Sequence, residues 1–106
     1  MVQQSYRQVF CYRLKQARKL KGLSQKKLGI LAGIDEFVAS TRINRYEKGV
    51  HEVDIETAQK LAVVLEVPLA FLYTEDNLLA ELIMNYHKLP DEAKLMIHNT
   101  LNQHTV

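Results

Sequence analysis

The chain has 106 residues, of which 47% are hydrophobic and 25% are charged, with only four Gly and two Pro. This length and composition are typical of one compact helical domain, and they argue against a disordered chain or one that depends on disulfide staples. The formal net charge of +2 hides an asymmetry, because residues 1–51 carry +8 and residues 52–106 carry −6. A basic front half indicates a surface that faces a polyanion, and an acidic back half indicates a surface kept away from it.

The cysteine count and the hydropathy pattern indicate a cytoplasmic location. The lone Cys11 allows no intramolecular disulfide and no multi-cysteine metal site. No apolar run approaches the roughly 20 residues that cross a bilayer, and the first ten residues lack the basic-then-apolar order of a secretory signal. We therefore expect a cytoplasmic protein without a membrane partner.

Helical periodicity runs through nearly the whole chain, beginning with a first helix over residues 6–21. The apolar side of this helix consists of residues at three- and four-residue spacing: Phe10, Leu14, Ala17 and Leu20. Gly22 ends the helix, and Ser24 is a ready N-cap for a second, short helix. Gly33 stops the second helix after about two turns, and a third helix ends near Lys48.

The second half of the chain continues with helices and predicts an all-α fold. Asp54 caps a fourth helix through Glu66, and Pro68 fits the first turn of a short fifth helix that ends near residue 73. The inward positions of the fourth helix are Ala58, Leu61, Ala62 and Leu65. Two longer helices follow over about residues 77–88 and 91–103, separated by Leu89-Pro90. The only plausible boundary lies at residues 74–76, which gives a domain over residues 1–74 and a C-terminal helical hairpin over residues 75–106, packed on it.

Residues 24–48 have the outline of a helix, a Gly-containing turn and a second helix. In a DNA-binding helix-turn-helix, the second of these helices lies in the major groove. If Ile43 is the buried anchor of the third helix, the outer face and its borders contain no acid. The residues there are Ser40, Thr41, Arg42, Asn44, Arg45 and Lys48. Arg pairs bidentately with guanine, Asn pairs with adenine, and a Thr methyl group can contact the thymine methyl group. The residues alone fit base readout and an ordinary solvated helix face equally well.

Glu47 is the exception on the third helix, because it falls on the inner face, where an unpaired carboxylate is costly. Arg18, one turn before the end of the first helix, faces the same core. We expect a buried Arg18–Glu47 ion pair that joins the two helices and keeps the carboxylate off the outer face.

The run LKQARKLKGLSQKKLGILAGI, followed by RINRYEKG, resembles the Cro/phage-repressor type of helix-turn-helix, also called the xenobiotic-response-element type. The resemblance covers about residues 8–74, and the matching positions are Leu23-Ser24-Gln25, Gly29, Ala32-Gly33-Ile34, Ile43 through Gly49, and the ion pair Arg18 and Glu47. It implies a five-helix domain that binds double-stranded DNA, commonly as a homodimer on a pseudo-palindromic operator. It implies base readout by Gln25, Ser40, Thr41, Arg42, Arg45 and, less directly, Asn44. It implies phosphate contacts by Ser24, Lys26, Lys27, Lys48 and His51.

Two features depart from the family pattern. Eight residues separate Ile34 from Ile43, about four more than the family has, and they begin with Asp35 and Glu36. One interpretation extends the third helix by a turn with Asp35 as its N-cap. We prefer the other, in which residues 35–38 form a longer turn, Phe37 or Val38 packs on the core, and the helix begins near Ala39, because an acidic first turn in the groove would meet phosphate repulsion.

The second departure is His51-Glu52-Val53, where the family often has a basic residue and then Pro. Glu52 would weaken a loop that contacts phosphate, so we expect modest DNA affinity.

The remaining candidates for chemistry do not form a pattern. The four histidines are dispersed along the chain: His51, His87, His98 and His104. We therefore expect neither a metal site nor a cofactor, and no motif indicates an enzyme. Cys11 is expected to be a small buried hydrophobe. The C-terminal hairpin carries more apolar residues than one domain core needs, which favours a homodimer seam.

The sequence thus predicts a sequence-specific DNA-binding transcriptional regulator, and we expect it to act as a repressor. An antitoxin or a restriction-system controller of the same fold is the alternative within that class. A protein-interaction module that uses the acidic C-terminal hairpin, with an unidentified protein partner, is the alternative from another class.

Overall fold

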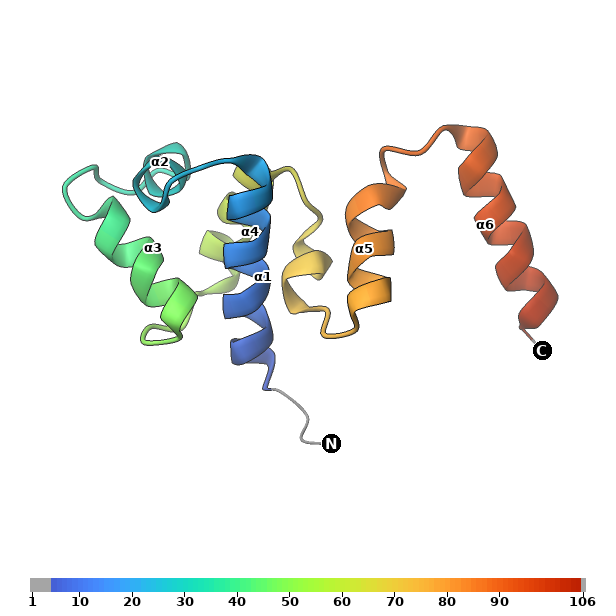
Figure 1. The fold of residues 1–106 in the computed structure, drawn as a ribbon, viewed down its shortest axis with the longest axis horizontal. Coiled ribbons are helices and arrows are strands. Elements are labelled where there is room, and N and C mark those ends of the chain that lie inside the picture. Colours follow the sequence, from blue (N-terminus) through green and yellow to red (C-terminus); the bar gives the residue numbers. More distant parts are fainter. Residues whose placement is uncertain (1–4, 106) are drawn as a thin grey trace.

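The computed structural model describes residues 5–105, and every element within this range is a helix (Figure 1). The expected all-α fold, with a helix-turn-helix and a C-terminal pair of helices, is confirmed. The elements in chain order are α1 (Tyr6–Lys21), α2 (Gln25–Leu31), α3 (Ala39–Lys48), α4 (Ile55–Leu65), the 3-10 helix η1 (Leu69–Tyr73), α5 (Asn77–Tyr86) and α6 (Asp91–His104).

The helix ends follow the capping residues of the sequence. Ser24 and Asp54 act as N-caps of α2 and α4, since their side chains accept hydrogen bonds from the backbone N–H groups three residues later. Gly22 ends α1 in the left-handed conformation with φ of 75°, which a residue with a Cβ atom adopts at a cost. Pro68 precedes the fifth helix as its N-cap instead of lying in its first turn, and that helix is of the 3-10 type.

The core lies where α1, α4 and η1 meet the pair α2 and α3. Its largest fully buried side chains come from five elements: Leu14, Leu28, Ile43, Leu61, Phe71 and Leu72. The inward positions predicted for α4 are all buried. Leu20 was expected on the apolar side of α1, but it is 67% exposed, because it lies in the last turn of that helix, past Ala17, the last buried residue of α1.

One buried cation joins the first helix to the C-terminal half. Arg13 is 2% exposed, and its guanidinium donates to the carbonyl oxygens of Thr74 and Glu75 at 2.8 and 2.9 Å. It also donates to the side-chain oxygens of Gln16 and Asn77, each at 3.0 Å. The segment between η1 and α5, where the sequence placed a boundary, is therefore fixed to α1 by hydrogen bonds.

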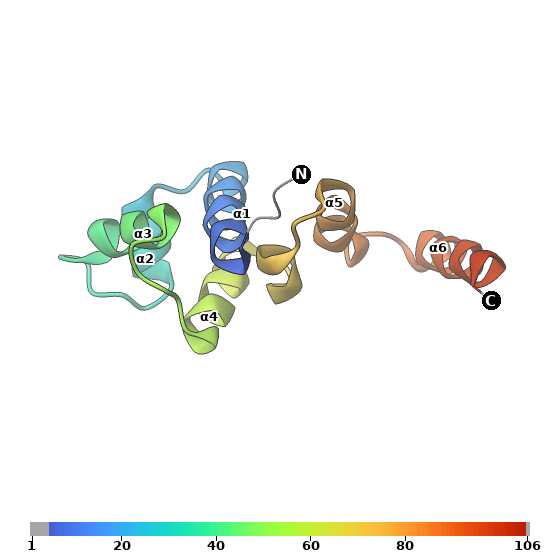
Figure 2. The same ribbon diagram turned by 90° about the horizontal axis from the view of Figure 1, so that it is seen from below.

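The two C-terminal helices differ in how they meet this core. Ala80 of α5 is buried, and α5 packs against η1, whereas α6 has no buried residue and lies away from the core (Figures 1 and 2). The side chain of Tyr86 at the end of α5 contacts α6 through a 2.5 Å hydrogen bond to Nε2 of His98. Within the described residues, α5 thus packs on the core, whereas α6 turns outward after Leu89-Pro90. The division into a domain over residues 1–74 and an extension over residues 75–106 stays a prediction.

The molecule is elongated as a result, with principal extents of 52 × 34 × 22 Å (Figure 2). Among residues 5–105, no helix combines the length and the apolar character that a membrane span requires.

Candidate nucleic-acid interface

The turn between α2 and α3 has the longer of the two expected forms. Residues 35–38 lie outside both helices, and α3 begins at Ala39. The turn is closed by Asp35, whose side chain accepts from the Phe37 N–H at 2.9 Å and whose carbonyl accepts from the Val38 N–H at 3.1 Å. The carboxylate of Asp35 is thus used inside the turn, as a turn-forming aspartate rather than as the N-cap of a longer helix.

The expectation that Phe37 or Val38 packs on the core is wrong. Phe37 is 88% exposed and Val38 is 42% exposed. The helices themselves meet closely just after the turn, because a Cβ atom placed on Gly29 of α2 would lie 2.7 Å from the Cβ of Ala39. Gly29 therefore permits a close approach of α2 and α3, and the apolar side chains of the turn lie outside this contact.

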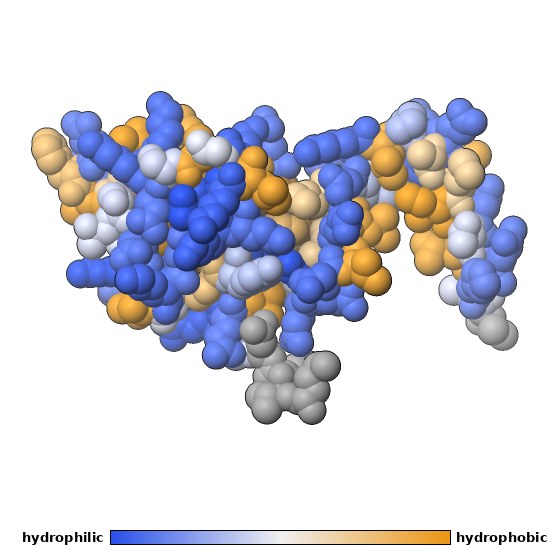
Figure 3. Space-filling view, viewed as in Figure 1, coloured by the Kyte–Doolittle hydropathy of each residue, from blue (hydrophilic) through white to orange (hydrophobic). Residues whose placement is uncertain are grey.

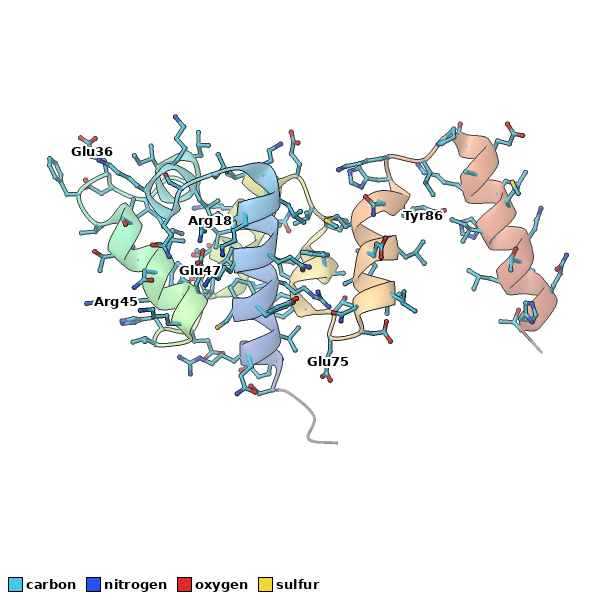
Figure 4. All side chains as sticks on the ribbon, in the orientation of Figure 1. Arg18, Glu36, Arg45, Glu47, Glu75 and Tyr86 are labelled. Carbon is cyan, nitrogen blue, oxygen red and sulfur yellow. The ribbon has the colours of Figure 1, made fainter. Side chains whose placement is uncertain are left out.

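The ion pair expected between the first and third helices is present (Figure 4). Nε of Arg18 lies 2.6 Å from Oε2 of Glu47, and its Nη2 lies 3.1 Å from Oε1, which is a bidentate arrangement. The Arg18 side chain is 12% exposed and the Glu47 side chain 3%. Nη1 of Arg18 also donates to the carbonyl of Leu23, at the start of the helix-turn-helix. The pair thus positions α3 relative to α1 and holds the one acid of α3 away from its outer face.

Two residues with a predicted role in base readout belong to the same network. The amide nitrogen of Gln25 lies 3.2 Å from Oδ1 of Asn44 and 3.2 Å from Oε1 of Glu47. Both Gln25 and Asn44 are half-buried. The first residue of α2 is therefore joined to the side of α3, and these two amides occupy the border of its outer face, where their base contacts stay predictions.

The other predicted reading residues lie on the exposed part of α3. Ser40, Thr41, Arg42 and Arg45 are all exposed, and Figure 4 shows Arg45 pointing away from the body of the protein. An open groove runs along this face and is lined by Val38, Thr41, Arg42, Arg45, Tyr46, His51 and Glu52. An open groove with both polar and apolar lining, beside a helix that presents two guanidinium groups, is suited to the base edges and phosphates of a nucleic acid.

The residues predicted to contact phosphate flank this face. Lys26, Lys27, Lys48 and His51 are exposed, whereas the hydroxyl of Ser24 accepts from the Lys27 N–H at 3.0 Å as the cap of α2. Glu52, the acid of the following loop, accepts a 2.8 Å hydrogen bond from the hydroxyl of Tyr6. This bond and the nearby Glu52 charge raise the pKa of the Tyr6 hydroxyl. The loop acid thus has a partner on α1.

Two side chains of α1 escaped the sequence interpretation. Arg13 had been counted with the cations of the basic half, but it is buried; its position among Phe10, Leu14 and Ala17 on the apolar side of α1 is the signal that could have shown this. Cys11, which was expected to be a small buried hydrophobe, is half-buried, and its thiol donates to the carbonyl of Tyr46 in α3 at 3.1 Å. Burial raises the pKa of this thiol. Over the described part of the chain, no three His, Cys, Asp or Glu side chains are grouped to hold a metal ion.

The fold and the interface define a helix-turn-helix protein, and comparison with known proteins agrees. The family model described as Helix-turn-helix matches residues 14–72, so the chain belongs to this family, and the resemblance to Cro/phage-repressor-type regulators is confirmed. The crystal structure of the transcriptional regulator BswR is similar with a TM-score of 0.82 and 45% identity, over 88% of this chain and 92% of that one.

Two curated relatives are uncharacterized HTH-type transcriptional regulators from Sinorhizobium medicae and Rhizobium meliloti. Each is 33% identical over 63 residues, which are 59% of this chain. The match spans 42% of the length of these relatives.

Proposed function

We propose that the protein is a sequence-specific regulator of transcription that binds double-stranded DNA in the bacterial cytoplasm. The observation that carries this proposal is the division of charge on α3. Arg42, Arg45 and Lys48 are exposed, while Glu47 is held by Arg18 with only 3% of its side chain exposed. The only carboxylate of this helix is buried in an ion pair, while its exposed face carries cations and hydroxyl groups beside a groove. Such a face is suited to lie against phosphates and base edges.

The proposed mechanism assigns affinity and specificity to different residues. The residues assigned to phosphate contacts are Ser24, Lys26, Lys27, Lys48 and His51. The cations among them would supply most of the affinity and make that affinity depend on salt, since binding releases counterions from the DNA. The reading group comprises Gln25, Ser40, Thr41, Arg42, Asn44 and Arg45. A good bidentate contact between Arg and guanine discriminates by roughly 1–3 kcal/mol. Repression is the simplest role for such a protein, because occupancy of an operator suffices to block transcription.

A homodimer is part of the proposal, and α6 supports it. This helix has no buried residue in the single chain, although Leu95, Met96 and Leu101 are 60%, 65% and 55% exposed. Leu78 of α5 is 80% exposed, and Figure 3 shows hydrophobic residues gathered on the sides of α5 and α6 that face each other. A second copy that covers these side chains would remove them from water. Its two-fold axis would relate two reading helices and fit a pseudo-palindromic operator.

The same exposed helix supports the second candidate, a protein-interaction module. In that case a different protein would cover α5 and α6, as in the antitoxin alternative, where the partner is a toxin. A restriction-system controller would share both the DNA contacts and the homodimer. The oligomeric state of the purified chain and its DNA binding separate these alternatives.

The proposal is tested by comparing two variants on cognate and scrambled duplexes. Arg45→Ala should lose affinity for the cognate duplex while its affinity for the scrambled duplex changes little, since it removes a base contact. Lys26→Ala should lower the affinity for both duplexes alike and make binding less dependent on salt, since it removes a phosphate contact. Lys60→Ala, on the exposed side of α4, is the matched control. Equal losses for Arg45→Ala on both duplexes would contradict the assigned roles.

A further inference from the structure

We propose that Val38 is a specificity residue that reads the C5-methyl group of a pyrimidine in the major groove. The inference rests on the proposed function, because it names one base feature that the same face recognises. Thymine carries this methyl group, and 5-methylcytosine presents the same group at the same place on the base.

The position of Val38 follows from the start of α3. Val38 is the N-cap residue of that helix, and its carbonyl accepts from the Arg42 N–H at 2.9 Å. Its side chain lines the groove together with Thr41, Arg42 and Arg45, which lie three, four and seven residues later. This spacing is that of one helix face, so Val38, directly before the first residue of α3, lies on the outer face one turn ahead of Thr41 and Arg42.

The residue type at this position is unusual for a helix start. Ser, Thr, Asp and Asn are preferred as N-caps, and Ser5, Ser24, Asp54 and Asp76 fill that role for α1, α2, α4 and α5. Val38 makes no side-chain cap hydrogen bond and leaves a branched apolar side chain 42% exposed. A residue that contributes so little to the free protein is where a contribution to the bound state is expected.

The chemistry of the groove indicates what that contribution is. The first residues of a recognition helix are those that reach base edges, and the thymine methyl group is the apolar feature of the major groove. Val38 and the methyl group of Thr41 would form an apolar contact, and the guanidinium of Arg42 beside them would bind a neighbouring guanine. Three acids lie near this contact. The carboxylate of Asp35 is turned onto the Phe37 N–H, and Glu52, which lines the same groove, accepts from the Tyr6 hydroxyl. Glu36 is exposed and does not line the groove. We therefore expect a C5-methyl pyrimidine next to a guanine in each half-site.

The test uses the full chain and an operator duplex recovered by selection. Each thymine is replaced in turn by deoxyuridine, which lacks only the methyl group, and the affinities of wild type, Val38→Ala and Val63→Ala are compared. Val63 is also an exposed valine, 65% exposed, but it lies on α4, away from the groove. At one position the replacement should lower the affinity of the wild type for the duplex about fourfold, as expected when one methyl group stays in contact with water. Val63→Ala should show the same loss, and Val38→Ala should show a clearly smaller one, because only the methyl group of Thr41 is left to contact the base.

A second arm identifies the source of the methyl group. The pyrimidine at that position is changed to cytosine and to 5-methylcytosine, each paired with guanine. Tighter binding of 5-methylcytosine than of the thymine duplex would assign a methylated operator, and the reverse order would assign thymine. In both cases 5-methylcytosine should bind more tightly than cytosine.

The inference and the proposed function fail differently. Suppose that the wild type binds its operator in a salt-dependent way, but each deoxyuridine replacement lowers the affinity of Val38→Ala as much as that of the wild type. Val38 then does not read the methyl group. If the wild type binds no duplex in a salt-dependent way, the proposed function fails, and this inference fails with it.

Discussion

Arg18 and Glu47, 29 residues apart in the chain, form a bidentate ion pair with Nε–Oε2 and Nη2–Oε1 distances of 2.6 and 3.1 Å. The pair joins α1 to the inner face of α3, and Gln25 of α2 donates to the same carboxylate. All three helices that set the orientation of the outer face of α3 therefore meet at one carboxylate. A substitution that removes this carboxylate should affect both the stability of the fold and the position of the outer face of α3.

Glu47→Ala should destabilise the protein by about 3–5 kcal/mol, because it leaves the guanidinium of Arg18 nearly buried without its counter-charge. Chemical denaturation of the variant measures this loss. The double variant Arg18→Met/Glu47→Leu is the control, since it removes both charges and restores apolar contacts; it should be more stable than Glu47→Ala. A Glu47→Ala variant whose free energy of unfolding lies within about 1 kcal/mol of the wild-type value would show that the pair does not hold the helices together.

Gly29→Ala should destabilise the helix-turn-helix, although alanine is the better helix former. The added Cβ would lie 2.7 Å from the Cβ of Ala39 and 3.1 Å from its Cα, so α2 and α3 would have to move apart. Overpacking of this kind costs about 1–3 kcal/mol. Thermal unfolding measures the loss, and Gln59→Ala, on the exposed side of α4, serves as the control. An unchanged melting temperature would contradict the close approach of α2 and α3.

Arg13→Lys should destabilise the protein by about 3 kcal/mol even though it keeps the charge. The ammonium cannot reproduce the planar set of hydrogen bonds that Arg13 donates to Thr74, Glu75 and Asn77. Hydrogen exchange should show faster opening at the start of α5, where these acceptors lie. The exposed Lys19→Arg on the same helix is the control and should behave as wild type. Equal protection of α5 in both variants would argue against the role given to Arg13.

The Cys11 thiol should react slowly with iodoacetamide near pH 8. Burial raises its pKa, so the reactive thiolate is scarcer than in an unfolded chain, whose thiol has a pKa of about 8.5. Because the folded-state pKa is the higher one, this thiol favours the folded state fully below the unfolded pKa, and that preference is lost as the pH rises through the folded value. The rate of alkylation against pH, compared in native and denaturing buffer, checks the direction. A native rate equal to the denatured rate at pH 8 would contradict it.

A homodimer built on α6 should dissociate when its exposed apolar side chains become charged. Leu95→Asp is expected to convert the dimer to a monomer in light scattering, while Asn99→Asp, which adds the same charge at an exposed polar position of α6, is not. A wild type that is monomeric at all concentrations would contradict the homodimer.

The sequence predicted the parts of the fold that depend on neighbouring residues. Gly22, Ser24 and Asp54 mark helix ends through local hydrogen bonds, and the apolar periodicity of α4 corresponds to its buried face. The Arg18–Glu47 pair was predictable because a carboxylate on an inner face needs a partner.

The residues that the sequence misplaced depend on distances between helices. Phe37 and Val38 are apolar, which suggests burial, but both are exposed in the turn, outside the close contact between Gly29 and Ala39, and that contact cannot be read from the sequence alone. Similarly, Arg13 is buried because carbonyl oxygens some 60 residues later in the chain surround its guanidinium. The outward course of α6 depends on the turn around Leu89-Pro90, and the helical pattern of α6 is the same in either direction.

The most direct test of the central claim is selection of duplexes from a random DNA pool at about 0.15 M salt, scored for an inverted repeat. The account predicts recovery of a pseudo-palindrome whose half-sites lie about one helical turn, roughly 34 Å, apart. It also predicts that binding to this sequence weakens steeply as salt is raised. Failure to enrich any sequence, together with no salt-dependent binding to any duplex, would contradict the account and leave a protein partner of α5 and α6 as the function to be sought.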